Sequence, residues 1–227
     1  MGPGNQAIWK LCGIMATKHG RSNVSCPHPC DKGRRLYFLA DVPHLLKNLR
    51  GHLVRGQEIF LDNATVRNHN LPTAKVSLEH VKKMCELDEQ HKLKLLPGLK
   101  LKDLNPNHFE KMDVASAVAL LNHSVGAAIR YLVSLQKLLK EALTTAWFFK
   151  QVFRWFTLMT SPAMKTALSD FCPEKAHEAK VFMENFKEMF SLLVILDNLS
   201  KVARKPVQTG VLISTEAALH LRNQPLP

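Results

Sequence analysis

Apolar residues recur at helical spacing over much of the chain. In residues 113–139 the steps are three and four, through Val114, Val118, Leu121, Val125, Ile129 and Leu132. Such a stripe is typical of a helix that faces a core. The small residues Ser124, Gly126, Ala127 and Ala128 in the same segment would let a neighbouring helix approach closely.

Three further segments predict the rest of a helical bundle. Residues 178–199 contain an apolar seam, formed by Phe182, Phe186, Met189, Leu193 and Leu196. An aromatic-rich helix is expected at 141–156, before Ser161-Pro162, and a short one at 210–222. The pattern therefore predicts a mainly α fold.

Shorter elements come before these helices. Residues 4–15 predict a helix whose inner face contains Ile8, Leu11, Cys12 and Met15. A second helix is expected after Ser77, with Val81, Met84, Cys85 and Leu87 facing inward. Residues 58–61 predict a short strand.

The remaining segments lack a clear period. We expect loops or linkers at 18–35, at 92–103 with a turn at Pro97-Gly98, and at 201–209.

A continuous apolar run at residues 36–41 has a different pattern. It reads Leu-Tyr-Phe-Leu-Ala-Asp and predicts a buried strand. Pro43 follows where a first helical turn accepts proline, and residues 44–54 show helical spacing. Asp41 therefore ends a strand beside a helix start, where mixed α/β folds place ligands and metals. An ordinary capping role for Asp41 is the alternative.

Charge and cysteine content narrow the function classes. The chain has 31 Lys+Arg against 19 Asp+Glu, a net charge of +12, which favours polyanions such as nucleic acid; dispersed lysines that only keep the chain soluble are the alternative. Five scattered cysteines do not form a disulfide framework.

Cys26, His28 and Cys30 lie close together in the sequence, but they lack the fourth ligand of a structural zinc site. We expect no membrane span and no signal peptide.

Several motifs together resemble one family. Residues 41–50, Asp-Val-Pro-His-Leu-Leu-Lys-Asn-Leu-Arg, are similar to the second-aspartate segment of P element-like transposases, whose full-length members often start with a THAP zinc finger. Residues 5–14 and 28–31 resemble the approach to that segment, and residues 104–112 and 122–129 resemble the helical insertion domain.

The resemblance implies an RNase H-like core interrupted by an all-helical insertion that holds GTP. Residues 1–55 would be a small α/β remnant of the RNase H-like fold, and residues 56–227 the insertion domain. Family members cut and join DNA at transposon ends, in the nucleus, with three carboxylates that bind two Mg²⁺ ions. Asp41 matches the middle carboxylate, as a catalytic and metal-binding residue. Association with a full-length transposase is a further implication.

The other two carboxylates are expected before Met1 and after Pro227. Glu184-Asn185-Phe186 imitates the last family motif, but it lies inside a predicted helix. One carboxylate cannot assemble a two-metal site, so we expect no nuclease activity from this chain alone. The alternatives are a repurposed basic protein that binds DNA or a transposase, and a plain helical scaffold. Steep loss of DNA binding with salt would favour the former.

The nucleotide site is also implied only by the resemblance, because the chain has no phosphate-binding Gly-x-x-x-x-Gly-Lys-Ser/Thr loop. The family pattern places Val114, Asn122 and Phe156 at GTP-binding positions. Asp113 stands where relatives have a basic residue, and Thr157 replaces an aspartate that reads guanine. A carboxylate that faces phosphates repels them. We therefore expect weak or absent GTP binding with the fold retained.

Overall fold

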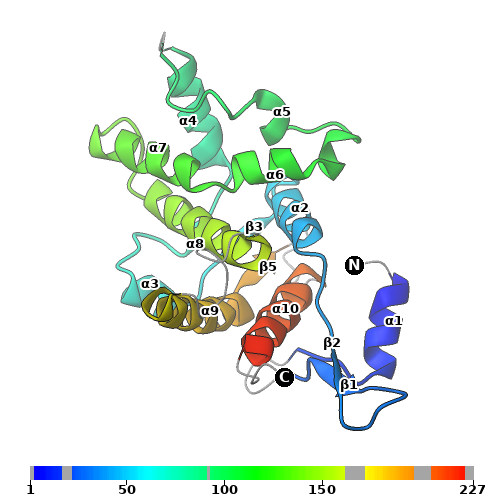
Figure 1. Cartoon of the computed structure of the whole chain (residues 1–227). Helices are drawn as coiled ribbons and strands as arrows, with labels where there is room; N and C mark the ends of the chain where they lie inside the picture. Colours follow the sequence, from blue (N-terminus) through cyan, green and yellow to red (C-terminus); the bar gives the residue numbers. More distant parts are fainter. Residues whose placement is uncertain (1–2, 17–21, 91–92, 162–171, 197–205, 223–227) are drawn as a thin grey trace. The chain divides into compact units, whose positions relative to one another are not determined.

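The computed structural model describes residues 3–16, 22–90, 93–161, 172–196 and 206–222 (Figure 1). The described helices are α1 (Pro3–Leu11), α2 (Val42–Val54), α3 (Asn63–Asn68), α4 (Glu79–Glu89), α5 (Leu101–Leu104), α6 (Val114–Leu120), α7 (His123–Ser134), α8 (Ala142–Thr160), α9 (Pro173–Leu192) and α10 (Pro206–Arg222). The strands are β1 (Ser25–Pro27), β2 (Arg35–Tyr37), β3 (Glu58–Phe60), β4 (Lys75–Val76) and β5 (Val194–Leu196), and Glu110–Met112 forms a 3₁₀ turn. The predicted mainly α fold is confirmed.

Contacts divide the chain into two compact units. Unit 1 contains residues 1–45, 155–192 and 204–227, and unit 2 contains residues 46–154 and 193–203. Helices α2 and α8 each contribute residues to both units. In the part of the chain that the structure describes, no helix is both long and apolar enough to cross a membrane.

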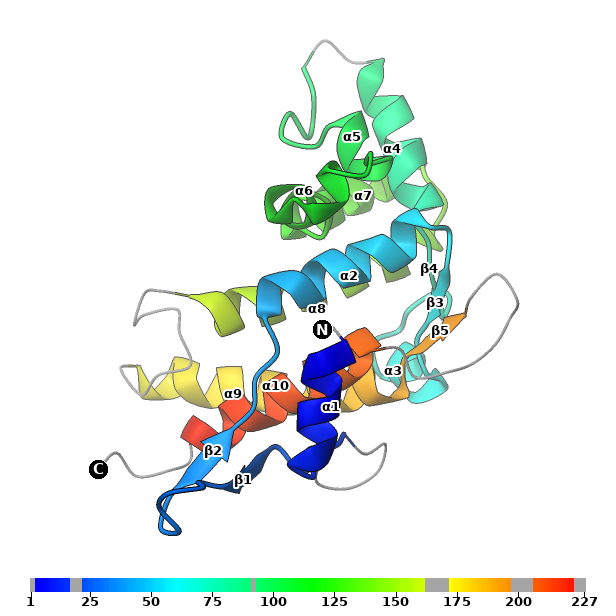
Figure 2. The same ribbon diagram turned by 90° about the vertical axis from the view of Figure 1, so that its right-hand side faces the viewer.

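Unit 2 combines a small sheet with helices. Strand β3 is central and pairs antiparallel with β4 on one side and β5 on the other. Ile59 of β3 lies opposite Val76 and Ile195, and all three side chains are buried. The strand predicted at 58–61 is therefore confirmed. Helix α4 packs against α7, and α5 packs against α6 (Figures 1 and 2).

Helices α7 and α8 approach closely at Gly126. A Cβ atom there would lie 2.7 Å from the carbonyl oxygen of Ala146 on α8, so a larger residue would force the backbones apart. The close approach expected from the small residues of this segment is confirmed at Gly126.

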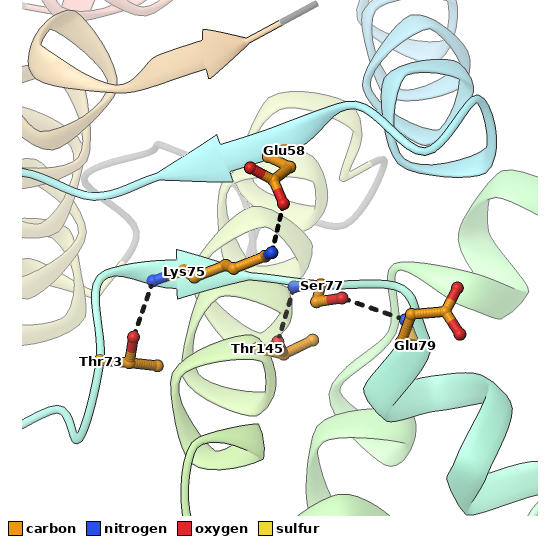
Figure 3. Close-up of polar contacts among 6 residues, drawn as sticks. All are labelled: Glu58, Thr73, Lys75, Ser77, Glu79 and Thr145. Atoms are coloured by element: carbon orange, nitrogen blue, oxygen red, sulfur yellow. Dashed lines mark hydrogen bonds and ion pairs between the residues drawn. The ribbon is translucent and has the colours of Figure 1, made fainter. Parts of the chain in front are cut away.

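A polar network joins the sheet, the start of α4 and α8 (Figure 3). The buried Thr145 hydroxyl on α8 accepts the N–H of Ser77 at 3.1 Å. The Ser77 hydroxyl in turn accepts the N–H of Glu79 at 3.2 Å, which orders the first turn of α4. Lys75 of β4 pairs with Glu58 of β3 across the sheet. The network therefore fixes where α4 begins.

Unit 1 is built around α9 and α10, which pack side by side (Figures 1 and 2). Trp155, at the unit 1 end of α8, stacks on Phe186 of α9 with ring centroids 5.6 Å apart. Its indole N–H donates to the Thr215 hydroxyl of α10 at 2.9 Å. The predicted apolar seam of α9 is buried at Phe182, Phe186 and Met189.

The amino-terminal part of unit 1 differs from its predicted structure. The strand expected at 36–41 is reduced to β2, which forms a two-stranded antiparallel pair with β1, inside the expected loop. Leu36 and Leu39 are exposed rather than buried, because no other described strand covers them.

The expected inner face of α1 is also wrong. Ile8 and Leu11 of this helix are exposed, and so is Met15, which lies beyond its end. Trp9 is buried instead, and its ring meets the edge of the Phe38 ring with centroids 6.2 Å apart. Trp9 and its contact with Phe38 therefore lie on the inward face of α1.

Several predicted helix bounds differ from the structure, including the end of α1 at Leu11 and of α8 at Thr160. The single helix at 113–139 is two helices, because Leu121 leaves helical geometry and Asn122 caps α7. The helix at 178–199 begins earlier and ends at Leu192, and its apolar steps continue into β5. The helix at 210–222 starts at Pro206, inside the expected linker. Predictions that fall on residues 17–21, 91–92, 162–171 and 197–205 lie outside the described residues.

The Thr145 network gives a stability prediction. Replacement Thr145→Val keeps the volume but leaves the Ser77 N–H without its acceptor and removes the contact with His80 Nδ1, 2.9 Å away. We expect the free energy of unfolding to fall by about 1–3 kcal/mol. Chemical denaturation checks this. Thr160→Val, at an exposed threonine of the same helix, is the matched control and should change stability by no more than about 0.5 kcal/mol; equal effects of the two variants would contradict the role of the network.

Candidate metal and nucleotide sites

Asp41 lies in unit 1, immediately before α2. Its side chain is exposed, and its carbonyl oxygen accepts the N–H of Leu45 at 3.0 Å in the first turn of the helix. Pro43 sits in this first turn, as predicted. A carboxylate beside a helix amino terminus is favoured by the unpaired N–H groups there. One residue earlier, the Ala40 N–H donates to the buried Ser214 hydroxyl of α10 at 2.8 Å.

These surroundings do not fit a two-metal centre. Among the described residues, no group of three or more His, Cys, Asp or Glu side chains could hold a metal ion. A single carboxylate supplies too few oxygen ligands, whereas in-line displacement at two ions needs several. A two-metal step at Asp41 would therefore need further carboxylates. The Cys26, His28 and Cys30 side chains lie on and after β1, and His28 Nδ1 accepts the Cys30 N–H at 3.2 Å in a local turn.

Asp113 and Asn122, in unit 2, are helix caps. The Asp113 carboxylate accepts the Ala115 N–H at 2.9 Å and the Ser116 hydroxyl at 3.0 Å at the start of α6. These hydrogen bonds hold the pKa of Asp113 below its ordinary value of 3.8. The Asn122 side-chain oxygen accepts the Ser124 N–H at 3.0 Å at the start of α7. Both side chains therefore already have structural partners.

The three residues predicted for the nucleotide site belong to different parts of the fold. Half-buried Val114 is the first residue of α6, and half-buried Asn122 caps α7, both in unit 2. Phe156 is half-buried on the part of α8 that belongs to unit 1, and the adjacent Thr157 is exposed. The predicted turn at Pro97-Gly98 is confirmed.

Arg50 is a residue near Asp113 that the sequence patterns did not single out. Its side chain is buried on α2, and one guanidinium nitrogen donates to the Glu110 carbonyl oxygen at 2.7 Å. Burial lowers the pKa of Arg50, and the carboxylates of Asp103, Asp113 and Glu110 oppose that change. Arg50 follows the buried Leu49 on the apolar side of α2. A charged residue at an apolar position of a helix was therefore the sequence feature that could have indicated a buried arginine.

The cap at Asp113 predicts a specific pH dependence. Because its folded pKa is lowered, the ionised carboxylate stabilises the fold above about pH 4, and this contribution disappears as the pH falls through the folded pKa. Asp113→Asn keeps an acceptor oxygen but cannot titrate. We expect the melting-temperature difference between the parent and Asp113→Asn to shrink from about pH 6 to about pH 3. Asp113→Ala, which has no acceptor, controls for loss of the cap; a difference that does not change with pH would refute the assignment.

Two sequence comparisons show what the chain is similar to. Residues 44–169, more than half of the chain, match the family described as TNP-like, GTP-binding insertion domain. The chain is 25% identical over 214 residues to the transposable element P transposase of Drosophila melanogaster, in an alignment that covers 94% of this chain and 26% of that protein.

A solved structure extends the comparison to the fold. The structure titled Drosophila P element transposase strand transfer complex matches 97% of this chain with a TM-score of 0.75 at 23% identity. The match covers 46% of that solved chain, so this chain spans only part of each relative. On the match over residues 44–169, the chain belongs to the TNP-like, GTP-binding insertion domain family.

Proposed function

We propose that the chain is a portion of a P element-like DNA transposase. It contributes Asp41 as one metal-binding carboxylate and an insertion domain of the GTP-binding type, and it does not cut DNA by itself. The observation that carries the proposal is the fold match over 97% of the chain, together with the placement of Asp41 at the start of α2. The proposed division is the one expected from the sequence, an RNase H-like remnant at 1–55 and the insertion domain at 56–227.

DNA and a transposase are the proposed partners, and the nucleus is the proposed location. The net charge of +12 supports DNA binding through phosphate contacts. The Drosophila relative is a transposase, and the matching solved structure is titled as a strand transfer complex. Mg²⁺ would be held by Asp41 only together with carboxylates from outside the described residues.

We further propose that this insertion domain binds GTP weakly or not at all through Val114, Asn122 and Phe156. The ionised Asp113 carboxylate caps α6 next to Val114, where it occupies helix N–H groups that favour a phosphate. It also adds a repelling charge. Thr157 offers a hydroxyl where a carboxylate would accept guanine N–H groups, and charged hydrogen bonds are the stronger kind.

A cleavage assay tests the main proposal. The purified chain is incubated with supercoiled DNA that contains transposon ends, in Mg²⁺ and then in Mn²⁺. We expect a shift in mobility from binding at low salt but no nicked or joined product, because one carboxylate cannot hold two ions. Asp41→Asn is the matched control. Cleavage by the parent that disappears in Asp41→Asn would refute the claim that the chain is inactive alone.

A binding titration with a fluorescent GTP analogue tests the nucleotide proposal. We expect the parent to bind more weakly than the micromolar range, and the double variant Asp113→Asn, Thr157→Asp to bind roughly tenfold tighter or more, from one restored charged hydrogen bond and one removed repulsion. Asparagine is chosen because it keeps the cap, whereas lysine would place a positive charge at a helix amino terminus.

Two controls make the titration specific. Thr160→Asp adds the same charge at another exposed threonine of α8 and should not improve binding. A fluorescent ATP analogue reports whether a gain depends on the guanine base. Micromolar binding of GTP by the unmodified chain would show that the nucleotide proposal is wrong.

A further inference from the structure

The backbone around Asp41 is held by a helix that lies far away in the sequence. The Ala40 N–H donates to the Ser214 hydroxyl of α10 at 2.8 Å, across 174 residues. Ala40 is 6% exposed and Ser214 is fully buried. A buried N–H group needs an acceptor, and residue 40 lies between β2 and α2, outside any strand ladder. The Ser214 hydroxyl therefore supplies what a neighbouring strand would otherwise provide.

A second contact on the same face of α10 involves Gly210. A Cβ atom at Gly210 would lie 2.5 Å from Leu45 Cδ2 and 3.4 Å from Ala40 Cβ. Residues four apart lie on one face of a helix, so Gly210 and Ser214 together form a contact surface of small side chains. The residues that meet this surface, Ala40 and Leu45, lie before and after Asp41. The helix therefore contacts the segment on both sides of the exposed carboxylate.

We propose that Ser214 and Gly210 are positioning residues for the Asp41 carboxylate. Ser214 fixes the backbone one residue before Asp41, and Gly210 lets the first turn of α2 pack directly on α10. Side chains that orient a metal-binding group through its backbone belong to the supporting layer of such a site. The role of Asp41 rests on the proposed function, but the contacts themselves do not depend on it.

Residue-resolved amide hydrogen exchange by NMR tests the proposal on the whole chain. Ser214→Ala removes the acceptor, and we expect exchange of the Ala40 amide to rise roughly fivefold or more relative to the amides of α10. Thr215→Ala is the matched control, because it removes the next hydroxyl of the same helix, which is also buried but accepts from Trp155. It should leave the ratio of Ala40 to α10 exchange unchanged.

A second readout separates positioning from simple support of the core. The Asp41 carboxyl carbon resonance should move in Ser214→Ala and return toward the parent position in Ser214→Thr, which restores a hydroxyl. Gly210→Ala, which keeps the Ser214 hydroxyl, should move the resonances of residues 40–45 as the added methyl displaces Leu45. This variant also carries the test if Ser214→Ala does not fold.

Two results would overturn the inference. One is an unchanged Ala40 exchange ratio in folded Ser214→Ala, and the other is an Asp41 resonance that moves in neither Ser214→Ala nor Gly210→Ala. Neither measurement uses DNA, nucleotide or metal. A parent chain that cleaves DNA would therefore contradict the proposed function while the exchange result still decides the positioning role.

Discussion

The unit that contains Asp41 depends on the burial of one helix, α10. Its buried positions include four polar residues, Gln208, Ser214, Thr215 and Glu216. Hydrophobic burial has no direction, whereas buried polar groups need partners at defined geometry. Ser214 pairs with Ala40, Thr215 with Trp155 of α8, and Glu216 with Lys187 of α9. These partners lie on three different segments. These polar contacts therefore fix which segments pack on α10, and in which register.

In unit 2 the same physical requirement is met at helix ends. Asp113 and Asn122 satisfy N–H groups at the starts of α6 and α7, and Arg50 donates to a carbonyl just before α6. When a side chain caps the start of a helix, it accepts hydrogen bonds from the unpaired backbone N–H groups there, and no bound anion is needed to accept them. The caps at Asp113 and Asn122 therefore order the starts of α6 and α7 without any bound ligand.

The sequence predicted elements where local periodicity decides, and failed where tertiary contacts decide. The starts of α2 and α4 could be predicted because their signals are local: Pro43 lies in the first turn of α2, and the Ser77 hydroxyl accepts the Glu79 N–H at the start of α4. The break at Asn122 was missed because the apolar stripe continues across it, although asparagine is itself a cap signal. The helix start beside Asp41 could be predicted from residues 41–54, but the strand expected to end at Asp41 could not, because β2 ends at Tyr37. The contact of Ser214 with Ala40 could not be predicted either, since it spans 174 residues.

The contact between Ala40 and Ser214 also joins segments that a division by sequence position would separate. The division proposed from the sequence separates residues 1–55 from the rest, whereas the family match covers residues 44–169 and contacts place residues 1–45 in one compact unit with residues from α9 and α10. The contact-based units are not continuous in sequence, because each combines residues from distant parts of the chain. The pair β1–β2 has only two strands, and such pairs are marginal alone. The contacts of Ala40 and Leu45 with α10 hold the chain on both sides of Asp41, so the Asp41 segment depends on a helix that lies far away in the sequence.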